Sequence, residues 1–66
     1  MIKYTKKEKA EKLKKWRTQT KLSAKQFARL NKIPYSTYIK WEEGVTEIPY
    51  YILELLVVSM IHYELL

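Results

Sequence analysis

The chain has 66 residues, a length that allows one domain of limited stability. Cysteine is absent, which excludes disulfides and thiolate metal sites, and the single histidine, His62, cannot form a metal cage or a catalytic triad alone. The net charge of +6 conceals an asymmetry. Residues 1–41 carry 13 basic and 2 acidic residues (+11), whereas residues 42–66 carry 5 acidic residues and no basic one (−5). This asymmetry indicates a polyanionic partner for the first part and another role for the second.

A helix is predicted over 6–18. Thr5 and Glu8 form a capping box at its start, and the segment is rich in Lys, Glu, Ala and Leu, all good helix formers. One face, at helical spacing, consists of Ala10, Leu13, Trp16 and Arg17. The lysines elsewhere on the helix are expected to be mostly solvated: Lys6, Lys7, Lys9, Lys12, Lys14 and Lys15.

Two short helices are predicted next, over 24–31 and 34–42. Ser23 and Gln26 form a second capping box, and Pro34 suits the first turn of the following helix. Gly44, the only glycine, lies where that helix should end in the left-handed conformation. The inward residues are Phe27, Ala28, Tyr38 and Trp41, and a small alanine permits the two helices to cross closely. This is the layout of a helix-turn-helix.

The last predicted helix, 50–65, follows Pro49 and is apolar nearly all round, so it needs cover on more than one side. A second copy of the chain would supply that cover. The candidate dimer interface is Tyr51, Leu55, Val58, Ile61, His62 and Leu65. Because acidic residues and His62 interrupt this segment, and the N-terminus has no apolar signal-peptide core, we expect neither a membrane span nor secretion but a cytoplasmic protein.

The outward positions of helix 34–42 are the candidate DNA base contacts: Tyr35, Ser36, Ile39 and Lys40. A serine or a lysine can bond a base edge, and an exposed Ile39 suits a thymine methyl group. Two alternatives stay open. For Tyr35, the alternative is that its ring packs on the domain and only its hydroxyl contacts a phosphate. For Ile39, the alternative is a surface residue without a role in binding.

Candidate phosphate contacts surround the start of helix 24–31 and the next helix: Lys21, Ser23, Lys25, Gln26 and Thr37. Four aromatic side chains would suit stacking on single strands, but their helical spacing favours a place in the core: Trp16, Phe27, Tyr38 and Trp41.

Three motifs in order give a resemblance to a known family. They are Leu13-Lys-Lys-Trp-Arg17, Leu22-Ser-Ala-Lys-Gln-Phe-Ala28 and Tyr38-Ile-Lys-Trp-Glu-Glu-Gly44. Together they resemble the Xre/Cro family of phage-repressor-like helix-turn-helix proteins, over roughly two-thirds of the chain. The resemblance implies a small all-α repressor-like domain of four helices, a single domain over 1–66, and a bacterial or phage origin.

The resemblance also implies an ion pair between Arg17 and Glu42 that joins the first and third helices; the alternative is two solvated charges. The chain departs from the family pattern at the turn. Lys32 stands where glycine or asparagine is common, so Asn31 is a second candidate for the left-handed conformation.

The first functional hypothesis is a sequence-specific regulator of double-stranded DNA, a dimeric repressor or autoregulator whose two recognition helices bind half-sites about 34 Å apart. The alternative is a protein-interaction module, antitoxin-like or an inhibitor, that uses the apolar C-terminal helix. We expect no enzymatic activity, no cofactor, no metal and no small-molecule ligand, because a domain this small has little cavity volume.

Overall fold

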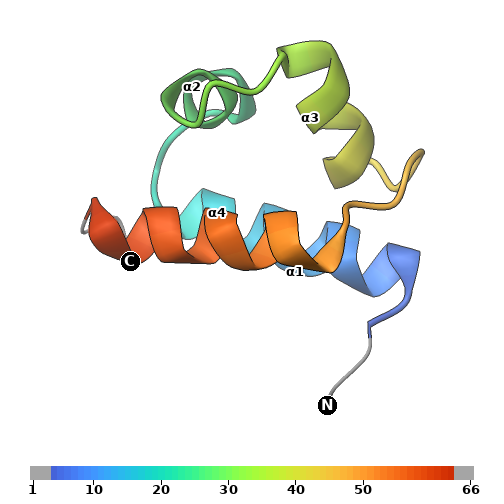
Figure 1. Cartoon of the computed structure of the whole chain (residues 1–66). Coiled ribbons are helices and arrows are strands. Elements are labelled where there is room, and N and C mark those ends of the chain that lie inside the picture. Colours follow the sequence, from blue (N-terminus) through green and yellow to red (C-terminus); the bar gives the residue numbers. More distant parts are fainter. Residues whose placement is uncertain (1–3, 64–66) are drawn as a thin grey trace.

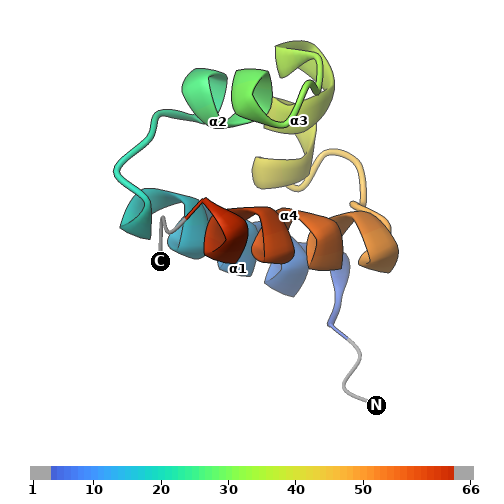
Figure 2. The ribbon, with the colours of Figure 1, turned by 60° about the vertical axis from the view of Figure 1, so that its left-hand side comes forward.

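Four helices build the computed structural model, which describes residues 4–63. They are α1 (Lys6–Gln19), α2 (Ala24–Leu30), α3 (Tyr35–Glu42) and α4 (Tyr50–His62), and the described part contains no strand. The α1 and α4 helices run side by side in one layer, and α2 and α3 form the other (Figures 1 and 2). The protein is thus an all-α domain, as the sequence predicts.

Helix boundaries follow local chemistry. The capping boxes at Thr5 and Ser23 are both formed, with each hydroxyl accepting from a backbone N–H three residues on. Pro34, the predicted first residue of the helix, is instead the N-cap of α3, which begins one residue later at Tyr35. The α4 helix ends at His62 rather than at residue 65, and the prediction for 64–65 lies outside the described residues.

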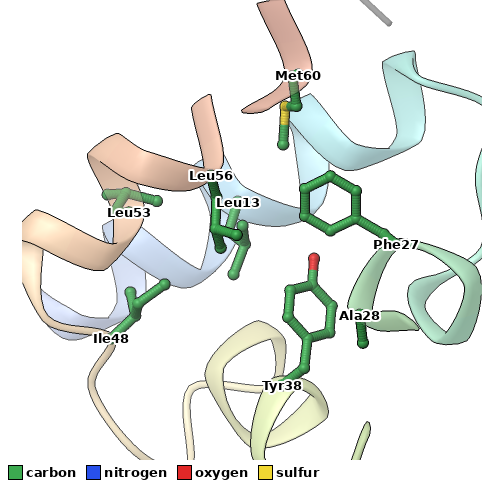
Figure 3. Packing of buried hydrophobic residues seen from close by; sticks show 8 residues of the cluster. All are labelled: Leu13, Phe27, Ala28, Tyr38, Ile48, Leu53, Leu56 and Met60. Carbon is green, nitrogen blue, oxygen red and sulfur yellow. The ribbon is translucent and has the colours of Figure 1, made fainter. Parts of the chain in front are cut away.

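The core lies between the two layers and takes residues from all four helices (Figure 3). Tyr38 of α3 and Phe27 of α2 are fully buried, with ring centroids 5.6 Å apart. They face the α4 residues across the core, and the remaining buried cluster is Leu13, Ala28, Ile48, Leu53, Leu56 and Met60. Trp16 and Trp41 are half-buried against this cluster, so all four aromatic side chains expected in the core pack in it or on it.

Lys9 differs from the expectation that the α1 lysines are solvated. Its residue exposure is only 3%, and its Nζ donates to Glu47 Oε2 at 2.8 Å and to the Ile48 carbonyl at 3.0 Å. The ammonium group also lies 4.3 Å from the centre of the Tyr50 ring. Lys9 therefore ties α1 to the segment that leads into α4. Sequence pattern missed it because its partners are 38 or more residues away.

A second contact strengthens the same corner. Tyr4 stacks on Tyr50, with ring centroids 6.1 Å apart, and its backbone N–H donates to the Tyr50 hydroxyl. Lys12 Nζ lies 4.7 Å from the centre of the Tyr4 ring. The start of α4 is therefore held on α1 by aromatic and cationic groups in addition to the core.

Candidate nucleic-acid interface

The α2–α3 unit is a helix-turn-helix in its geometry. Ala28 is 1% exposed where α2 and α3 pack, and the Ile33 backbone N–H donates to its carbonyl at 2.9 Å. Lys32 occupies the left-handed conformation, with φ 58°. Asn31, the other candidate, has φ −93°, and its side-chain amide instead donates to the Phe27 carbonyl at 2.9 Å. That bond is made at the C-cap of α2, where Asn31 keeps a negative φ.

The predicted ion pair between Arg17 and Glu42 is present and holds the C-terminal end of α3. Arg17 Nε donates to Glu42 Oε2 at 3.0 Å and Arg17 Nη2 to Glu42 Oε1 at 2.8 Å, a bidentate arrangement. A third bond, from Nη1 to the Leu22 carbonyl at 3.1 Å, ties in the loop before α2. The hydrogen-bonded carboxylate raises the pKa of Arg17. The pair thus holds α1, α3 and the α1–α2 loop in one arrangement.

The α3 outer face is the set Tyr35, Ser36, Ile39 and Lys40, the four candidate base contacts. Because Tyr38 and Glu42 point inward, Tyr35, Ser36 and Lys40 are exposed, and Tyr35 is 45% exposed. Ile39 is only half-buried. Tyr35 is therefore partly exposed, and it also lines a hollow with Ala28 and Ile33.

The five candidate phosphate contacts are exposed: Lys21, Ser23, Lys25, Gln26 and Thr37. Two of them already serve the α2 cap, since Ser23 Oγ accepts from the Gln26 N–H at 3.1 Å and Gln26 Oε1 accepts from the Ser23 N–H at 2.9 Å. These bonds use oxygen acceptors. The hydroxyl hydrogen of Ser23 and the amide hydrogens of Gln26 remain donors, as a phosphate partner requires. Lys21 has φ 65° in the α1–α2 loop.

Arg29 belongs to the same surface, although sequence pattern gave it no role. A shallow hollow between α2 and α3 is lined by Lys25, Ala28, Arg29, Ile33 and Tyr35. Lys25 and Arg29 are one helical turn apart and both exposed. In the sequence, the four-residue spacing of Lys25 and Arg29 was the available signal. The sequence pattern did not show that Tyr35 lies beside them.

This surface is predominantly cationic, and one exposed carboxylate, Glu43, adjoins it as the C-cap of α3. No carboxylate occurs between Glu11 and Glu42 in the sequence, and Glu42 is 8% exposed and paired with Arg17. The exposed cations of the α2–α3 unit are Lys25, Arg29, Lys32 and Lys40. The surface can therefore attract an extended anion without a compensating acid from these two helices.

The candidate dimer residues lie on the side of α4 that the domain leaves open. Tyr51, Leu55, Val58 and Ile61 are between 58% and 66% exposed, and His62 is exposed as well. Leu65 lies outside the described residues. Near this face, a groove between α1 and α4 is lined by Tyr4, Trp16, Tyr50, Leu53, Glu54, Val57 and Val58.

Two other kinds of feature are absent from residues 4–63. No group of three or more histidine and acidic side chains is placed to hold a metal ion. In the same part of the chain, no helix is both long enough and apolar enough to cross a membrane.

Comparison with known proteins adds no relative. No protein-family model, no curated protein sequence and no solved structure matches the chain. The resemblance to the Xre/Cro pattern consequently rests on the residues of the chain itself and on the α2–α3 geometry described above.

Proposed function

We propose that the protein is a DNA-binding regulator of the Xre/Cro type that binds double-stranded DNA through α3. The observation that carries this proposal is the predominantly cationic surface of the α2–α3 unit, from which α3 projects Tyr35, Ser36 and Lys40 outward. Major-groove recognition needs an exposed helix face with hydrogen-bonding side chains, flanked by cations for the phosphates.

The division of roles follows from the positions. Lys40 and Ser36 offer donors to base edges, and Ile39 offers an apolar contact to a thymine methyl group. Tyr35 stands at the first turn of α3 beside Lys25 and Arg29, so the three side chains could contact a base and a neighbouring phosphate together. Ser23 and Gln26, which form the capping box of α2, retain side-chain donors for the DNA phosphates.

The decisive experiment is selection of bound sequences from a random duplex pool, followed by affinity measurements on the selected site. Wild-type protein should enrich a defined sequence. Tyr35→Ala and Lys40→Ala should each lower affinity for that sequence about tenfold or more, with the helical circular dichroism unchanged. As a control, Lys7→Ala, an exposed lysine of α1, should bind nearly as wild type does. Failure to enrich any sequence would refute the proposal.

A second function has a specific observation in its favour. The exposed α4 residues are the type of surface that binds another protein, as an antitoxin-like or inhibitor protein would require. This role does not exclude DNA binding, since the two surfaces share no residue.

A further inference from the structure

The described α4 helix carries an apolar seam with the spacing of a two-stranded coiled coil. The α4 seam is defined as Tyr51, Leu55, Val58 and His62, whose members are successively four, three and four residues apart. Alternation of four and three is the pattern of core positions in a coiled coil. The seam lies on the opposite side of the helix from Leu53, Leu56 and Met60, which are the α4 residues buried in the domain.

The spacing of the α4 seam is the same from either end, so it fits a second copy of α4 in an antiparallel arrangement. If a second copy of α4 lies antiparallel on the first, Leu55 faces the other copy's Val58 and Tyr51 faces the other copy's His62. Each contact then occurs twice, as a two-fold interface requires. A parallel copy would instead place each seam residue against itself, with Tyr51 facing Tyr51 and His62 facing His62.

Charge and area also favour a second copy. The seam contains no carboxylate or lysine, and Glu54 is the one carboxylate on described α4, so two copies can meet with little repulsion. An interfacial membrane helix would carry lysine or arginine beside its apolar face, and α4 has neither. The exposed parts of Tyr51, Leu55 and Val58, with Ile61 beside the seam, amount to roughly 500 Å² per copy. Complete burial would remove about 1,000 Å² for both copies, the lower limit for a specific interface.

The position of the α4 seam determines where the two α3 helices go. The inward residues of α3 and α4 meet across the core, with Tyr38 on one side and Leu53, Leu56 and Met60 on the other (Figure 3). Because α3 and α4 belong to different layers (Figures 1 and 2) and both turn their buried residues toward the core, the α3 outer face and the α4 seam face away from each other. A two-fold rotation reverses any direction perpendicular to the interface, so the two α3 outer faces of a dimer point away from each other.

From this geometry we propose that two copies associate through antiparallel α4 helices and that the dimer bridges two separate DNA segments. The proposal rests on the proposed DNA-binding function. It departs from the expectation of two half-sites about 34 Å apart on one duplex, which needs both α3 helices on the same side of the dimer. Each copy would bind its own duplex, and the joining of segments, as in a loop, would be the activity of the dimer.

The dimer interface can be tested without DNA. Wild-type protein at about 100 μM should be dimeric by sedimentation equilibrium, and Leu55→Glu should be monomeric. Val45→Glu is the matched control, because Val45 is 60% exposed but lies outside α4, and it should remain dimeric. A monomeric wild-type chain would overturn the proposal and leave the α4 seam for a different protein partner.

Register is tested by cross-linking, since the chain has no cysteine of its own. A mixture of Tyr51→Cys and His62→Cys chains should form a mixed disulfide dimer on oxidation. A mixture of Leu55→Glu/Val58→Glu and Leu55→Lys/Val58→Lys chains should restore the dimer that each variant alone loses. Preferential linking of Tyr51→Cys chains to each other would contradict the antiparallel arrangement.

Bridging is tested with two copies of the selected duplex, one on beads and one labelled and free. Wild-type protein should capture the free duplex, Leu55→Glu should lose capture at least tenfold while binding a single duplex unchanged, and Val45→Glu should capture normally. A dimer that binds duplex without capturing a second one would overturn the bridging proposal. If wild-type protein binds no duplex, the proposed function fails together with bridging, while sedimentation and cross-linking still decide the interface.

Discussion

Arg17 and Glu42 form a bidentate ion pair, with bonds of 3.0 and 2.8 Å, that joins α1 to the last residue of α3. Both side chains are largely withdrawn from water, at 14% and 3% side-chain exposure. The pair closes the end of α3 nearest the core, while the other end carries Tyr35 and Ser36. The orientation of the proposed recognition helix thus depends on one arginine two helices away.

Arg17→Ala should destabilise the protein by about 3–5 kcal/mol, because it leaves the Glu42 carboxylate buried without a partner. Urea unfolding followed by circular dichroism measures this loss. The double variant Arg17→Met/Glu42→Met should recover most of the stability, since it leaves no buried charge. A double variant as unstable as Arg17→Ala would show that the pair does more than neutralise its own charges.

Lys9→Ala should destabilise the protein by about 1–2 kcal/mol, whereas Lys7→Ala should stay within about 0.5 kcal/mol of wild type. The Ile48 carbonyl loses a donor in the first variant, and the contribution from Glu47 is small because its side chain is 54% exposed. Equal stabilities of the two variants in urea would mean that the Lys9 contacts contribute nothing measurable.

Acid should destabilise the protein partly through Glu47. Its hydrogen bond to Lys9 holds its pKa below the ordinary value of 4.5. A lowered folded-state pKa contributes stability that is present above the ordinary value and is lost as the pH falls through the folded-state pKa. Glu47→Gln should therefore lower stability at pH 7 and flatten its decrease below pH 4.5. Unfolding curves at several pH values test this, and an unchanged slope would assign the effect to other carboxylates, such as Glu8, whose backbone bond from Thr5 also lowers its pKa.

Lys32→Gly should stabilise the protein by up to about 1 kcal/mol, because lysine at φ 58° is strained and glycine is not. The gain is limited by the greater freedom of glycine in the unfolded chain. Lys14→Gly, at an exposed position in the middle of α1, should instead destabilise by about 1 kcal/mol. Thermal unfolding of the two variants should give shifts of opposite sign, and shifts of the same sign would contradict the assigned turn conformation.

DNA affinity should fall steeply with salt, as expected when several lysines and arginines neutralise phosphates. Arg29→Ala should reduce the slope of log affinity against log salt by about 1 and leave sequence preference unchanged, the behaviour of a phosphate contact. Lys40→Ala should change the preferred sequence as well. Titrations at four or more salt concentrations on selected and altered duplexes separate the two, and a shift in preference with Arg29→Ala would assign it a base contact.

Much of the fold could be predicted because its signals are local. The capping boxes at Thr5 and Ser23 and the left-handed Gly44 each depend on residues within a few positions, and the structure contains all three. Lys9 was missed because burial of a lysine is decided by distant residues that happen to offer oxygen atoms. Local sequence also did not decide whether Asn31 or Lys32 takes the left-handed conformation. The bond from the Asn31 side chain to the Phe27 carbonyl forms only when the end of α2 is in place.

The candidate site was predictable to a similar extent. Helical periodicity separates Tyr35, Ser36 and Lys40 from Tyr38, which is why the α3 outer face could be given from sequence. Arg29 could not, because its proximity to Tyr35 arises from the packing of α2 on α3. The direction of the α4 seam relative to α3 likewise depends on the whole fold.

The pattern of burial along α3 has a consequence for changing what the protein binds. Tyr38 and Glu42 supply the buried contacts of this helix, and Tyr35, Ser36 and Lys40 are exposed. Under the proposed function, substitutions at those three positions should alter the preferred DNA sequence with little change in the free energy of unfolding. The scaffold is consequently suited to redesign, in which the rest of the chain is kept and a library of three residues is screened for new target sites.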